Sequence, residues 1–393
     1  MRVRHLFAAV GLCLIFSVPI MANEVSGYVV GGTPVKPSDD HSWMASIRLT
    51  SKQLSHNCGG TVVNERWVLT AAHCVVQQAS AEQYQVIPPS KLNVMVGTTS
   101  GTVEDVATLY AVSHVVVHPD YSPQANVQVT PQPDGSVITE VLRPALDNDI
   151  ALLRVDRPFS AQITPILLAT DKDADEIDLS LGSQWSDTNR PKNTKVTGWG
   201  STQTSGTGTS EKLMEAELSF LPMPECFNRL ELGNEAYYII DSPRNRTKVC
   251  ALPPAVIFDS DGTSKEYGPD SCKGDSGGPL RVKNALGDWI QFGIVSGGPV
   301  GKLVCGSLVR PSFYTRIGTY YSWILSNVAK VPEKPITGPN IIREEEAKND
   351  CIAGSTGISQ NNCNMKSASG GAISWFGMLL VFFIGWLRRS MIK

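Results

Sequence analysis

A serine set among glycines is the residue of this chain best suited to chemistry. Residues 270–279 read Asp-Ser-Cys-Lys-Gly-Asp-Ser-Gly-Gly-Pro, with Ser276 between Asp275 and two glycines. Gly274 lets the backbone turn so that the N–H groups of Gly274 and Ser276 point at one spot, where a tetrahedral oxyanion could form. The segment therefore predicts a nucleophilic serine that has its own oxyanion hole.

A serine hydroxyl becomes a nucleophile when a histidine takes its proton and a carboxylate orients that histidine. Two further segments offer these partners: Thr-Ala-Ala-His-Cys contains His73, and Asp-Asn-Asp-Ile-Ala-Leu-Leu contains Asp149. Taken singly, such a histidine is more often a core residue or a metal ligand, and Asp-Asn-Asp is more often a turn. Together and in this order, the segments favour a triad in which Ser276 attacks, His73 carries the proton and Asp149 holds the imidazole.

The three segments resemble the motifs of the trypsin-like serine proteases, and the resemblance covers about residues 29–330. It implies an all-β fold of two six-stranded antiparallel β-barrels with the active site between them, His73 and Asp149 on the first barrel and Ser276 on the second. Short β-rich runs separated by turn residues agree with this architecture. The runs lie at 60–63, 67–70, 92–96, 111–117, 150–155, 195–198, 291–295 and 312–316. Helical spacing of apolar residues over 319–329 predicts a closing helix that packs on the barrels.

The composition is that of an exported globular protein. The 393 residues carry a net charge of -3, which gives no electrostatic basis for binding nucleic acid. A basic start, an apolar run over 6–20 and a following Met-Ala predict a signal peptide over 1–22. Cys13 lies within it, so eight of the nine cysteines remain, an even number that favours disulfides over a metal site. No metal or other cofactor is expected.

The resemblance implies how these cysteines pair. The implied bridges are Cys58–Cys74, Cys226–Cys250 and Cys272–Cys305, with Cys351 and Cys363 left as a separate pair. Another bridge of many relatives would fall at Thr194 and Val282, and both of its cysteines are absent here.

The resemblance also implies a cut before Val29. Val-Val-Gly-Gly from Val29 resembles the new amino terminus of an activated protease, whose freed amine pairs with the carboxylate beside the nucleophile, here Asp275. Residues 23–28 would then be a short propeptide. They contain no Arg or Lys, and Tyr28 precedes the cut. We therefore expect an activating protease that accepts an aromatic residue.

The place of Asp270, six residues before Ser276, matches the base of the trypsin pocket. A buried carboxylate there selects a cationic side chain, so we expect cleavage after Arg or Lys. The alternative is a loop carboxylate with no substrate role.

Four other residues match substrate-binding positions of the family. Ser271 and Ser312 match pocket-lining positions, and Ser296 and Gly298 match the strand along which the substrate backbone lies. Two positions depart from the family. Gly297 replaces the tryptophan of many relatives, which removes an aromatic platform for residues upstream of the cut. Ser312 replaces the glycine of trypsin, which would narrow the pocket or make it more polar.

Insertions lie where surface loops are expected. Residues 122–146 come just before Asp149 and are expected to overhang the substrate cleft. The acidic runs 171–176 and 259–262 favour solvated turns over calcium loops, because neither has the glycine and the distal glutamate together.

The carboxyl-terminal part predicts a separate tail. Residues 331–369 are polar and typical of a linker with a small disulfide loop, and residues 370–393 contain Gly-Gly, an apolar stretch over 372–387 and Arg-Arg. This arrangement resembles the GlyGly-CTERM sorting tail of Gram-negative bacterial proteins exported by type II secretion. A permanent membrane anchor and a GPI signal are the alternatives.

Together these features predict an exported serine endopeptidase, secreted or at the cell surface, that hydrolyses peptide bonds through an acyl-enzyme. The expected partners are protein or peptide substrates, an activating protease, export and tail-processing machinery, and a membrane contacted by the tail. A catalytically silent binding protein with a protease fold is the alternative, for which one expects a broken triad or a filled oxyanion hole.

Overall fold

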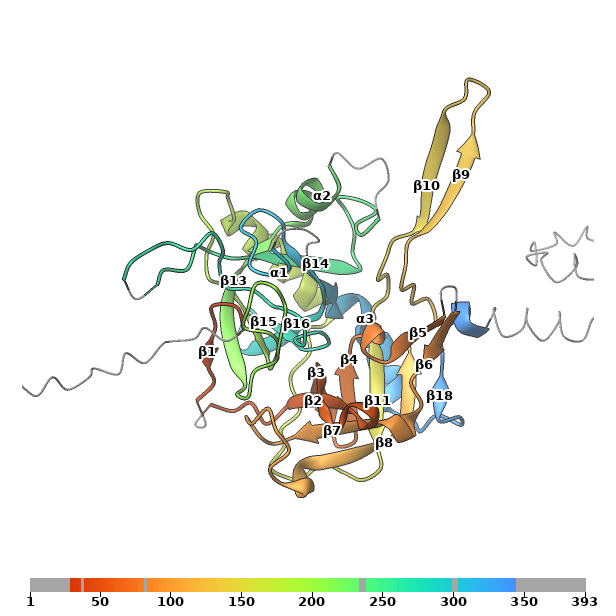
Figure 1. The fold of residues 1–393 in the computed structure, drawn as a ribbon, viewed down its shortest axis with the longest axis vertical. Helices are drawn as coiled ribbons and strands as arrows, with labels where there is room; N and C mark the ends of the chain where they lie inside the picture. Colours follow the sequence, from red (N-terminus) through yellow and green to blue (C-terminus); the bar gives the residue numbers. More distant parts are fainter. Residues whose placement is uncertain are drawn as a thin grey trace, which may run out of the picture.

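The computed structural model describes residues 29–343 except 37–38, 81–82, 233–237, 260 and 299–302. Two β-barrels make up its body (Figure 1). The first barrel has the strand order β11-β4-β3-β2-β7-β8 and closes through pairing of β11 with β8. Its strands are β2 (Met44–Leu49), β3 (Ser55–Asn64), β4 (Trp67–Thr70), β7 (Leu92–Val96), β8 (Leu109–Val117) and β11 (Ala151–Val155).

The second barrel has the order β13-β12-β15-β16-β17-β14 and closes through β13 and β14. Its strands are β12 (Thr194–Gly198), β13 (Met214–Leu221), β14 (Lys248–Leu252), β15 (Pro279–Lys283), β16 (Trp289–Gly297) and β17 (Ser312–Arg316), and β1 (Thr33–Pro34) pairs with β13 from outside. Closure removes the free edges of both sheets. The predicted all-β fold of two six-stranded antiparallel barrels is confirmed.

One apolar cluster runs through both barrels and includes Leu69 and Leu152 of the first barrel and Leu280 and Phe292 of the second, all fully buried. Because close-packed interiors deform little, this shared core fixes how the two barrels face one another.

The closing helix is present as α3 (Ile317–Val328), two residues longer at its start than the sequence predicts. Ile317, Tyr320 and Ile324 are buried, which puts one helical face against the protein. Two further α-helices are α1 (Asp171–Gln184) and α2 (Met223–Glu231), and the short 3-10 helices are η1 (Thr50–Lys52), η2 (Ala72–Cys74), η3 (Pro89–Lys91) and η4 (Val106–Thr108).

The expectation of a solvated turn over 171–176 is wrong, because this run begins helix α1. Thr170 and Asp173 form a reciprocal capping box, and acidic side chains in a first turn complement the helix dipole. Buried Arg316 ties the helix down through Asp175, at 2.6 Å, and Asp178, at 3.0 Å. The run 259–262 does form a turn, in which the Gly262 N–H donates to the carbonyl of residue 259.

Two β-hairpins lie outside the barrels. One joins β5 (Val76–Ser80) to β6 (Gln83–Val86), and the other joins β9 (Asn126–Pro131) to β10 (Val137–Arg143). The β9–β10 hairpin is the 122–146 insertion, and it projects from the body as a long ribbon (Figure 1).

The polar segment predicted as a linker begins on the first barrel. β18 (Ile336–Thr337) pairs in parallel with β8, and the Asn340 N–H donates to the carbonyl of Pro119. Across the described residues no helix is long and apolar enough to span a bilayer. The predicted signal peptide, the propeptide, the Cys351–Cys363 pair and the apolar stretch 372–387 lie outside the described residues.

Candidate active site

The first barrel brings His73 and Asp149 into direct contact. His73 lies on η2, and its Nδ1 is 2.7 Å from Oδ2 of Asp149, which is fully buried. The backbone N–H of His73 donates to Oδ1 at 2.9 Å, and the Ser296 hydroxyl donates to Oδ2 at 2.6 Å. These bonds hold the carboxylate in one orientation, with an N–H on Nδ1 of the imidazole.

The charges of this pair support one another. Burial opposes ionisation of Asp149, but the charge of His73 and the hydrogen bonds from His73 and Ser296 outweigh burial and hold the pKa of Asp149 below its usual value. Burial likewise opposes a charge on His73, yet the negative charge and hydrogen bond of Asp149 raise the pKa of His73. The imidazole is thereby made a stronger base.

The loop before Ser276 needs its glycine. Gly274 has a φ of +98°, and a Cβ built there would lie 2.9 Å from Cα of Gly200. Its carbonyl accepts a bond of 2.8 Å from Nε2 of His56, whose Nδ1 is 2.7 Å from Oγ of Ser46. Burial lowers the pKa of His56 to about 4, so this imidazole is neutral and fixes the direction of the Gly274 peptide. Sequence reasoning missed Ser46 and His56, because neither lies in a recognisable motif.

Asp275, beside Ser276, is a buried carboxylate held by backbone groups. Its oxygens accept hydrogen bonds of 2.8 Å from the N–H groups of Gly200 and Cys272. Burial raises its pKa to about 7. Val29 is also fully buried, and the Val30 carbonyl accepts a bond from the N–H of Asp270. The start of the described chain is therefore inserted beside the nucleophile loop.

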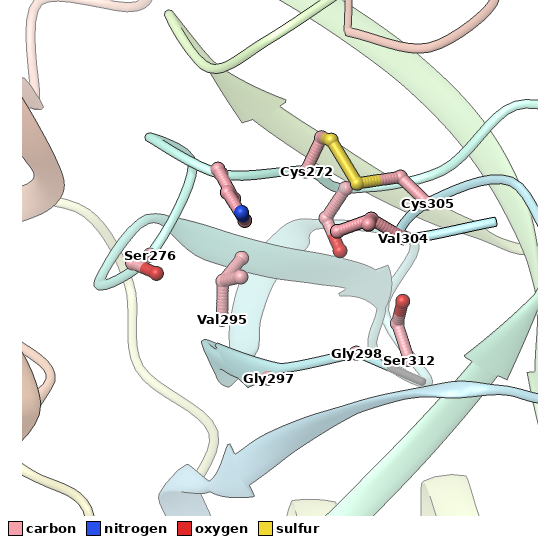
Figure 2. A pocket seen from close by; sticks show the side chains of 10 residues that line it. Cys272, Ser276, Val295, Gly297, Gly298, Val304, Cys305 and Ser312 are labelled. Atoms are coloured by element: carbon pink, nitrogen blue, oxygen red, sulfur yellow. A yellow bond between two sulfur atoms is a disulfide. The ribbon is translucent and has the colours of Figure 1, made fainter. Parts of the chain in front are cut away.

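A cavity of about 380 Å³ opens next to Ser276 in the second barrel (Figure 2). Ser276 lies at one end and Ser312 at the other, with the Cys272–Cys305 bridge along one wall. The predicted substrate-binding residues Ser271, Gly298 and Ser312 line it, and so does Gly297. The lining also includes three residues that the sequence did not point to: Lys273, Val295 and Val304. The Ser296 side chain is bonded to Asp149 and does not line the cavity.

Asp270 lies behind this lining and is fully buried. The Ser312 hydroxyl donates to Oδ1 at 2.8 Å and the Gly306 N–H donates to Oδ2 at 2.9 Å. These donors are neutral, and burial raises the pKa of Asp270 to about 6. A cation at the end of the cavity would offset that cost of burial.

The structure explains why residue 297 is glycine. A Cβ built on Gly297 would lie 2.4 Å from Cζ of Phe313, its cross-strand neighbour on β17. The buried Phe313 ring thus fills the space in which a side chain at 297 would begin.

Comparisons with known proteins agree with this geometry. The family model described as Trypsin matches residues 29–324. The chain is 31% identical over 313 residues to human serine protease 41, covering 77% of each chain. It is 29% identical to the CLIP domain-containing serine protease HP8 of Bombyx mori, covering 74% of this chain and 67% of that protein, and 29% identical to melanization protease 1 of Drosophila melanogaster, covering 81% and 70%.

The chain belongs to the trypsin family of serine proteases. The three disulfides expected from that family within the described residues, Cys58–Cys74, Cys226–Cys250 and Cys272–Cys305, are confirmed. Thr194 and Val282 are direct cross-strand neighbours on β12 and β15, which is where the absent trypsin-family bridge would lie. Cys58, His73 and Cys74 have ligand atoms within 4.8 Å of one another, but the disulfide leaves no thiolate to bind a metal.

Proposed function

We propose that this trypsin-family protein is a serine endopeptidase that works through an acyl-enzyme and cleaves after Arg or Lys. The observation that carries the proposal is the hydrogen bond between His73 and buried Asp149, together with Ser276 at the end of a cavity backed by a buried carboxylate.

In this mechanism Oγ of Ser276 attacks the substrate carbonyl carbon while Nε2 of His73 takes its proton. The N–H groups of Gly274 and Ser276 stabilise the resulting oxyanion, and Asp149 stabilises the imidazolium. The intermediate collapses to an acyl-enzyme as His73 gives the proton to the leaving amine. Water then attacks the acyl group with His73 again as base, which releases the acid and restores the Ser276 hydroxyl.

Asp270 supports the preference for a cationic side chain, because it is the buried carboxylate at the end of the cavity. An entering Arg or Lys would lie against Ser312, whose hydroxyl bonds Asp270. The cation would then favour the ionised form of Asp270, which burial alone disfavours.

The test of catalysis is Ser276→Ala, which should lower peptide turnover by about six orders of magnitude while the protein keeps its fold. Cleavage of a mixed peptide library, with cut sites located by mass spectrometry, should show Arg or Lys before each cut for the wild-type enzyme and no cuts for the variant. Substrate binding without any cleavage by the wild-type enzyme would instead identify a silent binding protein.

Activation is proposed to follow a cut after Tyr28. The freed amine of Val29 would pair with buried Asp275 and hold the oxyanion loop, because an ammonium removes the cost of the buried carboxylate. An enzyme specific for Arg or Lys could not make this cut itself. Amino-terminal sequencing of active enzyme should give Val29, and full activity with residue 23 still attached would contradict the proposal.

Export by type II secretion and removal of the tail near Gly370 or Gly371, with the membrane holding the precursor, are proposed from the sequence. Replacing both glycines should retain a longer, membrane-held form. Peptides from 386–393 in the released enzyme would contradict tail removal.

A further inference from the structure

The 122–146 insertion forms a surface that the proposed reaction does not use. Its strands β9 and β10 pair antiparallel, with Val137 opposite Pro131 and Val141 opposite Val127. In the part of the chain that the structure describes, these two strands pair only with each other, so each has a free edge. Free edges readily accept another extended chain.

One face of this ribbon is apolar. Side chains alternate between faces, so the pairing puts Val127, Val129, Val137 and Val141 on one side, which we name the valine face. Val127, Val129 and Val137 are 39%, 54% and 58% exposed. Apolar side chains beside a free strand edge offer an added strand side-chain contacts as well as backbone hydrogen bonds.

The opposite face is mixed and offers a matched control. It carries Gln128, Thr130 and Glu140, with Ile138 57% exposed and, at the bulge between Val141 and Arg143, Leu142 44% exposed. The whole insertion has only three charged residues, Asp134, Glu140 and Arg143, so charge does not select its partner.

The ribbon is firmly rooted beside the active site. Residues Ser122 and Asp147 exchange backbone hydrogen bonds of 3.0 and 3.2 Å at its base, two residues before Asp149. The Ala145 N–H bonds the carbonyl of Tyr238, in the segment leading to β14. The ribbon therefore rises from a fixed point next to the catalytic carboxylate.

The base of the ribbon shares an apolar cluster with the strand expected to carry the substrate backbone. Leu146 packs on the apolar cluster that contains Phe313. Phe313 in turn lies under Gly297, on the strand expected to carry the substrate backbone. The packing under the base of the ribbon is therefore continuous with the packing under this strand.

The size of the valine face restricts what can bind there. Six residues of strand are about 20 Å long and two strands are about 10 Å wide, which gives a face of about 200 Å². Two such faces would bury roughly 400 Å², well below the roughly 1,000 Å² of a specific interface. A second copy of the chain is therefore a poor occupant. A chain already held in the cleft is a good one, because tethering raises its effective concentration to about the millimolar range.

We propose that the ribbon binds an extended, apolar segment of the protein substrate, upstream of the cut bond, which adds to its edge as a third strand, with its apolar side chains on the same side as the valine face. This inference rests on the proposed endopeptidase function. Specificity would then have two parts: a cation in the pocket and a β-forming segment on the ribbon.

The test compares three fluorogenic peptides that share a four-residue sequence ending in Arg. The first has no extension, the second has a twelve-residue amino-terminal extension rich in Val and Thr, and the third has one of Gly and Ser. Twelve extended residues reach about 40 Å. The secreted enzyme should have a kcat/KM for the Val-Thr peptide roughly tenfold above the other two, as expected for burial of one or two valines.

The matched variants are Val129→Ser with Val137→Ser on the valine face, and Ile138→Ser on the opposite face. The valine-face variant should bring the ratio of kcat/KM for the Val-Thr peptide to kcat/KM for the Gly-Ser peptide close to one. Ile138→Ser should leave this ratio near ten. The proposal would be overturned if the wild type cleaved both extended peptides at the same rate. It would also be overturned if the valine-face variant kept the wild-type ratio, or if both variants lowered the ratio equally. Because the variants could unfold the ribbon, replacement of 126–143 by a short Gly-Ser turn is the second test, and it too should abolish the preference.

A binding measurement separates failure of this inference from failure of the proposed function. In Ser276→Ala protein, fluorescence anisotropy should show tighter binding of the Val-Thr peptide than of the Gly-Ser peptide, and Val129→Ser with Val137→Ser should remove the difference. A wild type that cleaves none of the peptides would refute the protease, whereas equal binding of the two peptides would refute the ribbon site. A concentration-dependent dimer that the valine-face variant abolishes would make a second copy the occupant and would also overturn the proposal.

Discussion

Replacing Asp270 with serine should separate selectivity from catalysis. The side chain is fully buried behind Ser312 and accepts hydrogen bonds from Ser312 and Gly306, whereas Ser276 lies at the other end of the cavity. Losing one partner of a buried charge pair costs about 2–5 kcal/mol, so kcat/KM on Arg and Lys peptides should fall by roughly 30- to 5,000-fold. Cleavage after apolar residues should change far less.

The same substitution should alter how stability depends on pH. The pKa of Asp270 is about 6, above its unfolded value, so the proton is bound more tightly in the folded state. Binding of this proton by Asp270 contributes fully to the free energy of unfolding below about pH 4, and the contribution is lost as pH rises through about 6. That loss amounts to roughly 3 kcal/mol, or about 6 °C in Tm. The Tm of Asp270→Ser relative to that of the wild type should therefore rise by about 6 °C between pH 4 and pH 7.

Two measurements check this reasoning. Cleavage of a peptide library measures selectivity, and calorimetric melting of both proteins from pH 4 to pH 7 measures how Tm depends on pH. Benzamidine, a small aryl amidinium, serves as a ligand for the pocket. Benzamidine should raise the Tm of the wild type at pH 7 but not that of Asp270→Ser. The role given to Asp270 would be refuted by a variant that still prefers Arg. It would also be refuted if the Tm difference between the variant and the wild type stayed constant from pH 4 to pH 7.

Three other predictions follow from the geometry. Because the pKa of His73 is raised and its neutral form is the base, kcat/KM should fall as pH drops through that pKa, and Asp149→Asn should move the midpoint to lower pH; a pH–rate profile with an unmoved midpoint would contradict this. Arg316→Met should leave Asp178 without its cation, whereas Asp175 keeps Arg246 at 2.7 Å. Because both carboxylates are more than a third exposed, the free energy of unfolding should fall by only about 1 kcal/mol, measured by denaturant titration. No measurable change would show that the ion pairs of Arg316 are dispensable. Gly297→Ala should lower the free energy of unfolding by about 1–3 kcal/mol through its clash with Phe313, and adding Phe313→Val should recover part of that loss. If Gly297→Ala left the free energy of unfolding unchanged, the Phe313 ring would not fill the space beside residue 297.

Local signals in the sequence located several strands and the closing helix, and the family resemblance supplied the two-barrel architecture. Short β-rich runs bounded by turn residues located β4, β7 and β17 to the residue, and helical spacing located α3 to within two residues. The glycine at 274 is a local requirement too, since its φ of +98° disfavours any other residue. Disulfide partners came from the family resemblance and not from local pattern.

Contacts between residues far apart in the chain were decided only by the tertiary structure. Ser296 bonds Asp149 from the other barrel, His56 holds the Gly274 carbonyl across 218 positions, and Arg316 ties down α1 from about 140 positions away. Each of these groups is polar and buried, so it needs a partner, but which partner it finds depends on how the closed barrels pack. The direction of the ribbon was likewise decided by the tertiary structure. The sequence shows that residues 122–146 are an insertion, but the backbone hydrogen bonds at its base set where it projects from the body. Direction in space depends on packing and not on local sequence pattern.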